Sequence, residues 1–130
     1  MKNLLHEIKK CAQNKYTKSY LVEKTDCDET GTVAMWVLLN LVEGMQDEPV
    51  KCLAKTSAQY KKDLKQVSLQ LYNPAHEGDK LELEARFYEV DRRNVELKVF
   101  VRKVKPDKST KRICRASYFF QAVFDSESAA

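Results

Sequence analysis

Residues 33–45 read VAMWVLLNLVEGM, and they form the most apolar stretch of this 130-residue chain. A helix that is apolar on nearly every side must be covered on nearly every side. Nine of the ten residues from Val33 to Val42 are apolar, a run that also fits a buried strand, but the threonines before it, the Leu and Met content and the length favour a helix. Gly44 fits the end of such a helix. The stretch therefore predicts a buried central helix.

The segments after residue 65 alternate apolar and polar residues, as strands with one packed face do. They are residues 67–71, 81–87, 95–101 and 112–124. Turn residues separate them, notably the loop at 73–79 and the charged hairpin at 103–111. The spacing predicts four strands that follow one another in an antiparallel meander.

The N-terminal half adds shorter elements. Residues 2–13 have apolar residues at helical spacing, and residues 17–25 are rich in the Thr, Tyr and Val of strands. Residues 46–63 fit both a strand and a helix, and Pro49 at the expected first turn favours the helix. The resulting order predicts a two-layer α+β domain, in which one antiparallel sheet wraps around the central helix.

The length of 130 residues is that of one domain, with a helix added in residues 1–16 and a frayed tail at 125–130. The formal net charge of +4 comes from 23 basic and 19 acidic residues that are interspersed. A nucleic-acid-binding protein usually shows a denser basic stripe, and a mildly basic surface also suits a phosphorylated ligand, so the charge alone does not decide between them. We expect no nucleic-acid partner. The longest apolar run is too short to cross a bilayer, so no membrane partner is expected.

The four cysteines are scattered, and none has the CxxC spacing of a zinc site. We therefore expect no metal, and we expect the four thiols to be reduced and mostly structural, which predicts a cytoplasmic protein. They are Cys11, Cys27, Cys52 and Cys114.

Two local motifs accompany this order of elements. Residues 26–33, DCDETGTV, lie between the first predicted strand and the central helix. They resemble the Asp-x-Asp-x-x-Gly-x-Val segment of the 4-hydroxybenzoyl-CoA thioesterase branch of the hotdog-fold thioesterases. Residues 74–81, PAHEGDKL, resemble the Pro-Ala-x-x-Gly-Asp-x-Leu turn common across that superfamily. The resemblance covers about residues 17–124 and implies the hotdog fold and hydrolysis of an acyl-CoA thioester. Coenzyme A then enters as part of the substrate, and no other cofactor is implied.

The resemblance also implies roles for individual residues. Asp28 corresponds to the catalytic carboxylate, which acts as nucleophile or as base for the attacking water. The backbone N–H near Met35 polarises the thioester carbonyl, because a helix N-terminus presents unpaired donors to a developing oxyanion. The alternative for Asp28 is a turn or helix-capping residue, and Asp26 reads as structural.

Residues around the helix start are candidates for contacts with the acyl group. Core packing is the alternative for the apolar members, and a structural hydrogen bond is the alternative for Asn40, which is expected to be a buried amide. The candidates are Gly31, Val33, Trp36, Leu39 and Asn40. A cluster of basic residues on the last hairpin is a candidate for the phosphates of coenzyme A, or else a solvated loop. This hairpin cluster consists of Arg102, Lys103, Lys105, Lys111 and Arg112.

The sequence departs from the resembled branch after the first motif, where Val37-Leu38-Leu39-Asn40 replaces an aromatic-rich segment. This motivates a second hypothesis, a non-catalytic module that binds acyl-CoA or an acyl carrier. A third is an interaction protein that uses the hairpin cluster to bind RNA or heparin. Open sheet edges and an apolar helix predict a homodimer or homotetramer under any of these hypotheses.

Overall fold

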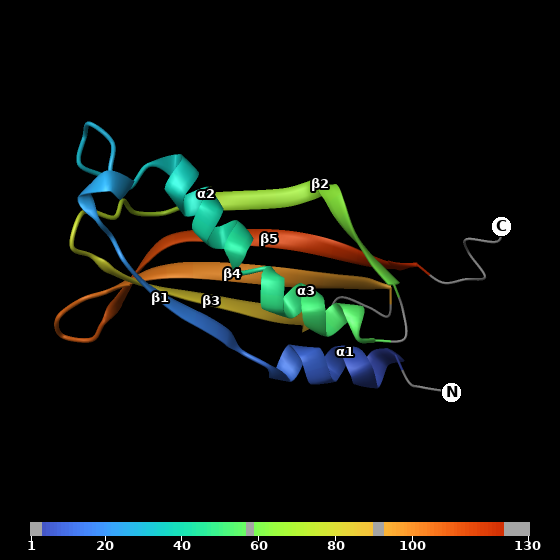
Figure 1. Cartoon of the computed structure of the whole chain (residues 1–130). Helices are drawn as coiled ribbons and strands as arrows, with labels where there is room; N and C mark the ends of the chain where they lie inside the picture. The colour runs from blue at the N-terminus through green and yellow to red at the C-terminus, as the bar shows by residue number, and fades with distance from the viewer. Residues whose placement is uncertain (1–3, 57–58, 90–92, 124–130) are drawn as a thin grey trace.

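The computed structural model describes residues 4–56, 59–89 and 93–123, so the expected tail at 125–130 lies outside the described residues. Three helices, a short 3-10 turn (η1) and one five-stranded sheet make up this part of the chain (Figure 1). Their bounds are α1 Leu4–Gln13, β1 Tyr16–Leu21, η1 Lys24–Asp26, α2 Met35–Gly44, α3 Asp47–Ala54, β2 Gln59–Leu71, β3 Lys80–Glu89, β4 Asn94–Val104 and β5 Thr110–Val123.

The sheet has the strand order β1-β3-β4-β5-β2, and each pair is antiparallel. The expected meander holds for β3, β4 and β5. It is wrong for β2, which pairs with β5 at the far edge and not with β3. β1 takes the free side of β3, so the chain after β2 must cross the end of the sheet through residues 72–79. Tyr72 and Asn73 start this crossing with hydrogen bonds to the Ile113 and Arg112 carbonyls.

The inner face of the sheet carries the core. Alternate residues of β3, β4 and β5 are at most 4% exposed, and Val37, Leu38 and Val42 of α2 pack against them. The predicted alternation in these three strands is therefore confirmed. The sheet residues are Leu81, Leu83, Ala85, Phe87, Val95, Leu97, Val99, Val101, Cys114, Ala116, Tyr118, Phe120 and Ala122.

The central helix is confirmed, but the expectation that it is covered on every side is wrong for a single chain. Met35, Trp36 and Leu39 are 44%, 61% and 42% exposed, and Asn40 is exposed too. These residues lie on the side of α2 that faces away from the sheet. Apolar composition predicts burial without saying whether the cover comes from the same chain or from a second copy.

The ambiguous segment 46–63 divides into both predicted structures. Its first part is α3, with Pro49 buried in the first turn, and its last part begins β2. The strand predicted for residues 17–25 is shorter than expected. β1 ends at Leu21, and residues 24–26 form η1 instead, because Asp26 turns back onto the Glu23 N–H.

Two of the four cysteines are joined. Cys11 of α1 and Cys52 of α3 form a disulfide across a Cα–Cα distance of 6.0 Å, which corrects the expectation of four reduced thiols. Sequence spacing did not reveal the pair because α1 and α3 meet only in the folded domain. Cys27 and Cys114 are free thiols. None of the helices within the described residues is long and apolar enough to cross a membrane.

Candidate active site

Asp26 anchors the loop that leads into α2. Its side chain is buried, and its Oδ2 accepts hydrogen bonds from the Tyr20 hydroxyl and the Glu23 N–H, both at 2.8 Å. Its carbonyl accepts the Ala34 N–H at 2.9 Å, which fixes the residue before the helix. The hydrogen bond to Asp26 raises the pKa of Tyr20. These contacts agree with the structural role expected for Asp26.

The loop from Cys27 to Val33 folds back on itself as a tight turn. Cys27 and Val33 form an isolated β-bridge, and the Asp28 N–H donates to the Thr32 carbonyl at 2.9 Å. Gly31 has a φ of +82°, a backbone conformation that residues other than glycine rarely adopt. Gly31 therefore serves the turn, and the turn places Asp28 beside the start of α2.

The carboxylate of Asp28 is exposed and held from one side. Its Oδ1 accepts the Thr30 N–H at 2.9 Å, the Thr30 hydroxyl and, at 3.4 Å, the Thr32 hydroxyl. Hydrogen bonds from the Thr30 side chain and backbone lower the pKa of Asp28, so the group is ionised at neutral pH. No hydrogen bond from the described residues reaches Oδ2, which leaves this oxygen available for chemistry.

The start of α2 presents free backbone donors. The Val33 and Ala34 N–H groups are taken by the Ala75 and Asp26 carbonyls, and the next helical bonds come from Val37 and Leu38. Ala34 at the N-cap supplies no side-chain cap. Within the described ranges, the N–H groups of Met35 and Trp36 therefore have no hydrogen-bond partner.

A groove of about 300 Å³ adjoins these donors. Thr32, Val33, Met35 and Leu38 form one wall, and residues 71–75 form the other. We call it the N-terminal groove. Asp28 does not line the groove itself, but the hydroxyl of Thr32, which does, donates to Asp28 Oδ1 at 3.4 Å.

The structure places the sequence-predicted residues in two groups. Asp28, Gly31, Val33 and Met35 belong to the groove or to the turn beside it. Trp36, Leu39 and Asn40 lie outside it on the open face of α2, and Asn40 is not the buried amide that was expected. Their role in binding the acyl group stays a prediction that depends on a second copy of the chain.

Sequence reasoning missed the second wall of the groove, Leu71 to Ala75. The two motifs are in direct contact, because Thr32 and His76 form a β-bridge and the Val33 N–H donates to the Ala75 carbonyl at 2.8 Å. The Pro74-Ala75 pair of the second motif could have predicted this wall. A turn that accompanies the first motif in the resembled family is expected to pack against that motif.

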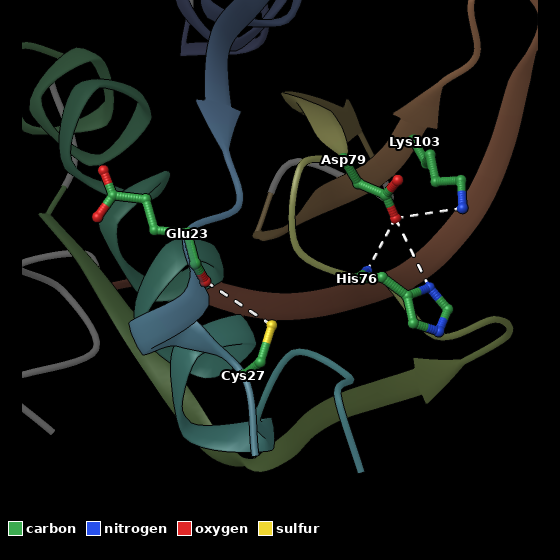
Figure 2. Close-up of polar contacts among 5 residues, drawn as sticks. All are labelled: Glu23, Cys27, His76, Asp79 and Lys103. Carbon is green, nitrogen blue, oxygen red and sulfur yellow. Dashed lines mark hydrogen bonds and ion pairs between the residues drawn. The ribbon is translucent and has the colours of Figure 1, made fainter. Parts of the chain in front are cut away.

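Asp79 organises the turn of the second motif (Figure 2). Its Oδ2 accepts the His76 N–H at 2.8 Å and lies 3.2 Å from Lys103 Nζ and 3.8 Å from the His76 ring. Lys103 is therefore already paired, as is Arg102, which lies 3.7 Å from Glu84. These two members of the hairpin cluster are less available to a ligand than the others.

One further member of the hairpin cluster, Arg112, contacts a residue that lines the groove. Arg112 stacks over the Tyr72 ring at 5.8 Å, and Tyr72 belongs to the groove wall. Lys105, Lys111 and Arg112 are exposed, and Lys103 faces Lys111 across the hairpin. Among the described residues there is no group of three or more His, Cys, Asp or Glu side chains that is arranged to hold a metal ion.

Solved structures share this architecture. 4-Hydroxybenzoyl CoA thioesterase from Pseudomonas superposes with a TM-score of 0.63 at 14% identity, over 83% of this chain and 84% of that one. A variant of 4-hydroxybenzoyl CoA thioesterase complexed with 4-hydroxybenzoyl CoA gives 0.65 at 14% identity, over 83% of both chains. A 1,4-dihydroxy-2-naphthoyl-CoA thioesterase from Synechocystis gives 0.61 at 14% identity, over 85% and 82%.

The chain has the hotdog fold. A variant of a hexameric broad-specificity acyl-coenzyme A thioesterase matches this hotdog domain too, with a TM-score of 0.65 at 18% identity over 85% of this chain and 80% of that one. No protein-family model and no curated protein matches the sequence. At these identities the shared property is the fold, and the activity of this hotdog domain is inferred from its own residues.

Replacing Thr30 with valine should raise the pKa of Asp28 toward its ordinary value of 3.8, because the Thr30 hydroxyl makes the largest contribution to the lowered value. The measurement is an NMR titration of the Asp28 carboxyl carbon. Thr17→Val on the exposed side of β1 is the matched control and should leave the titration unchanged. An unaltered pKa in Thr30→Val would show that the hydroxyl does not hold the carboxylate.

Proposed function

We propose that this hotdog domain hydrolyses an acyl-CoA thioester to a carboxylic acid and free coenzyme A. One observation carries the proposal: the ionised carboxylate of Asp28 is hydrogen-bonded to Thr32, and Thr32 lines the same groove as Met35, whose N–H has no hydrogen-bond partner among the described residues. The fold supports it, because the solved structures that share the fold are described as thioesterases acting on acyl-CoA or aroyl-CoA.

The proposed chemistry divides between the two groups. The thioester oxygen gains negative charge during attack, and the N–H groups of Met35 and Trp36 with the positive end of the α2 dipole stabilise it. Asp28 either attacks the carbonyl carbon, forming an anhydride that water then hydrolyses to the acid and the free Asp28 carboxylate, or takes a proton from a water that attacks the carbonyl carbon directly. In both routes the C–S bond breaks, and the coenzyme A sulfur leaves with a proton that derives from water. Beyond the coenzyme A of the substrate, the proposal requires no cofactor.

The nucleotide end of coenzyme A is assigned to the exposed part of the hairpin cluster, Lys105, Lys111 and Arg112. Arg112 contacts Tyr72, which lines the groove. The part of a bound ligand that extends out of the groove past Tyr72 would therefore lie near a positive charge. The surface of the hairpin also suits an acyl carrier with an acidic face, which is the binding-module alternative.

The function is tested by mixing the purified protein with short, long and aromatic acyl-CoAs and following the release of free thiol. Turnover of at least one of these names the substrate class. Acyl-pantetheines, which lack the nucleotide phosphates, serve as a second arm and should show a raised KM if the hairpin cluster binds those phosphates. Saturable binding without thiol release would instead establish the non-catalytic module.

The assembly proposed for this function is a homodimer. The open face of α2 exposes Met35, Trp36 and Leu39, and β2 is an edge strand that exposes Val67 and Leu71. Unpaired strand edges and contiguous apolar side chains are the surfaces that a second copy covers. In the proposed homodimer, Trp36, Leu39 and Asn40 of one protomer would contact residues of its partner. These contacts would complete the acyl site.

Trp36→Asp should weaken this dimer at least about tenfold, because it places a charge at the centre of the apolar face. Sedimentation over a range of protein concentrations measures the change. Tyr88→Asp is the matched control, since Tyr88 is an exposed aromatic residue on β3. An unchanged dimer in Trp36→Asp would place the contact elsewhere.

The proposed compartment is the cytoplasm, where acyl-CoA is present. Cys11 and Cys52 are joined in a disulfide, so only Cys27 and Cys114 are the free thiols expected of a cytoplasmic protein. Disulfides are uncommon in reducing compartments, so in the cytoplasm this bond is expected to open and close with the redox state.

A further inference from the structure

The N-terminal groove is lined by apolar side chains on both walls. Of the described residues that line it, none is charged and most are apolar. The apolar ones are Val33, Met35, Leu38, Leu71, Pro74 and Ala75. Leu38 and Ala75 are buried, whereas Met35 and Leu71 are exposed, so apolar surface extends from the buried part of the groove to its rim.

The three polar side chains of the lining already have hydrogen-bond partners. The Tyr72 hydroxyl donates to Gln70 Oε1, and the Asn73 Nδ2 donates to the Arg112 carbonyl, both at 2.7 Å. The third, Thr32, takes part in the hydrogen bonds of the turn before α2. These side chains therefore offer no cation to a ligand in the groove.

Two charged residues contact the lining from outside. Arg112 lies over the Tyr72 ring, but it lines a separate cavity of about 50 Å³ together with Arg102 and Arg115. None of these three arginines lines the N-terminal groove. The other charged residue is Asp28, whose ionised carboxylate accepts the Thr32 hydroxyl. A second carboxylate bound in the groove would therefore lie near a charge of its own sign and face no lining cation.

This lining treats charged and uncharged acyl groups differently. An apolar acyl group gains free energy when it is buried against such walls. A carboxylate loses part of its hydration there and receives no cation in return. The Met35 N–H is a free donor, but in the proposed chemistry it binds the thioester oxygen. A carboxylate that took this donor would displace the thioester oxygen, and such a complex would not react.

We propose that the N-terminal groove selects thioesters of uncharged, apolar acyl groups and rejects acyl groups that carry a second carboxylate. Leu71 and Pro74, on the wall formed by residues 71–75, are specificity-determining residues because their side chains keep that wall free of charge. This inference rests on the proposed function and adds the class of acyl group to it.

Isovaleryl-CoA and malonyl-CoA are a matched pair of substrates. Their acyl groups have nearly the same shape, with two methyl groups at the end of one and two carboxylate oxygens at the end of the other. The coenzyme A part is identical, so its contacts with the hairpin cluster cancel. We expect kcat/KM to be at least about tenfold higher for isovaleryl-CoA, because burial of two methyl groups alone gives about that factor. Release of free thiol measures both rates.

Pro74→Lys connects the preference to the groove. Pro74 is exposed in the loop after β2, and a lysine there brings an ammonium group to the apolar wall. The ratio of kcat/KM for isovaleryl-CoA to that for malonyl-CoA should fall at least about tenfold, the effect of one hydrogen bond to a charged group. Pro106→Lys is the matched control. Pro106 is an exposed proline of the hairpin that does not line the groove, so the ratio should stay unchanged.

Leu71→Lys is a second variant, in case Pro74→Lys folds poorly. Leu71 is 53% exposed at the end of β2, and Leu21, which is 61% exposed at the end of β1, provides the control Leu21→Lys. The ratio should fall in Leu71→Lys and stay unchanged in Leu21→Lys. Circular dichroism establishes that each variant is folded.

Two kinds of failure can be distinguished. Equal kcat/KM for the two substrates, or a ratio that neither groove variant changes, would overturn the selectivity and leave the hydrolysis intact. Absence of thiol release from both substrates and from acetyl-CoA would instead overturn the proposed function. In that case the Kd values of isovaleryl-CoA and malonyl-CoA carry the test. A tenfold difference in Kd would support selection by the groove, and equal Kd values would overturn it.

Discussion

Asp28→Asn is expected to lower kcat for acyl-CoA hydrolysis by about 100-fold or more, the contribution of a positioned catalytic group. The amide keeps the size of the side chain and its Oδ1 still accepts the Thr30 N–H, so the turn and the fold should persist. What is lost is the ionised Oδ2. Thiol release measures the rate, and circular dichroism with thermal unfolding confirms that the protein remains folded.

Asp107→Asn is a closely matched control. Asp107 is an exposed aspartate whose Oδ1 accepts the Ser109 N–H at 2.9 Å and the Ser109 hydroxyl at 2.6 Å, which repeats the contacts of Asp28. The same hydrogen bonds lower the pKa of Asp107. Because Asp107 does not line the N-terminal groove, its replacement should leave kcat unchanged. A loss of less than about tenfold in Asp28→Asn would reduce Asp28 to a turn residue.

Opening the disulfide between Cys11 and Cys52 is expected to lower the free energy of unfolding by about 4 kcal/mol. The bond closes a loop across a sequence separation of 41 residues, and loop closure of that length restricts the unfolded chain by about this amount. The measurement is denaturant unfolding of the oxidised protein and of Cys52→Ala, with and without a phosphine reductant.

Cys27→Ala provides the comparison for this experiment. Cys27 is a free thiol and, like Cys52, it is partly buried, so both substitutions remove a similar amount of packing. Cys27→Ala should be about as stable as the unsubstituted protein and should remain sensitive to the reductant. If the reductant leaves the unsubstituted protein equally stable, the two cysteines contribute nothing to stability through their bond.

The sequence predicts where the helices and strands lie along the chain better than it predicts which of them pack or pair with one another. Alternation tells which face of a strand each side chain takes, and this is enough for β3, β4 and β5. It carries no information on which strands pair, so the place of β2 beside β5 was not predictable in this way. The composition of α2 likewise predicts an apolar surface but not whether this chain or a second copy covers it.

The residues of the candidate site that are close in sequence were likewise predictable, and those that come from distant segments were not. Asp28 and Met35 are seven residues apart in one continuous segment, the first motif and the start of the helix after it, so reading along the chain finds both. The second wall, Leu71 to Ala75, comes from about 40 residues further on and joins the site only through backbone pairing with Thr32 and Val33. Four cysteines allow three pairings even when all are bonded, so their spacing alone could not single out Cys11 and Cys52.

The disulfide has a topological consequence for the proposed catalytic segment. Residues 11–52 form a covalent ring in the oxidised protein, and Asp28, Gly31 and Met35 all lie within it. A protease that cuts the exposed turn at residues 28–31 would therefore leave two pieces still joined to each other. They would separate on a denaturing gel only after reduction.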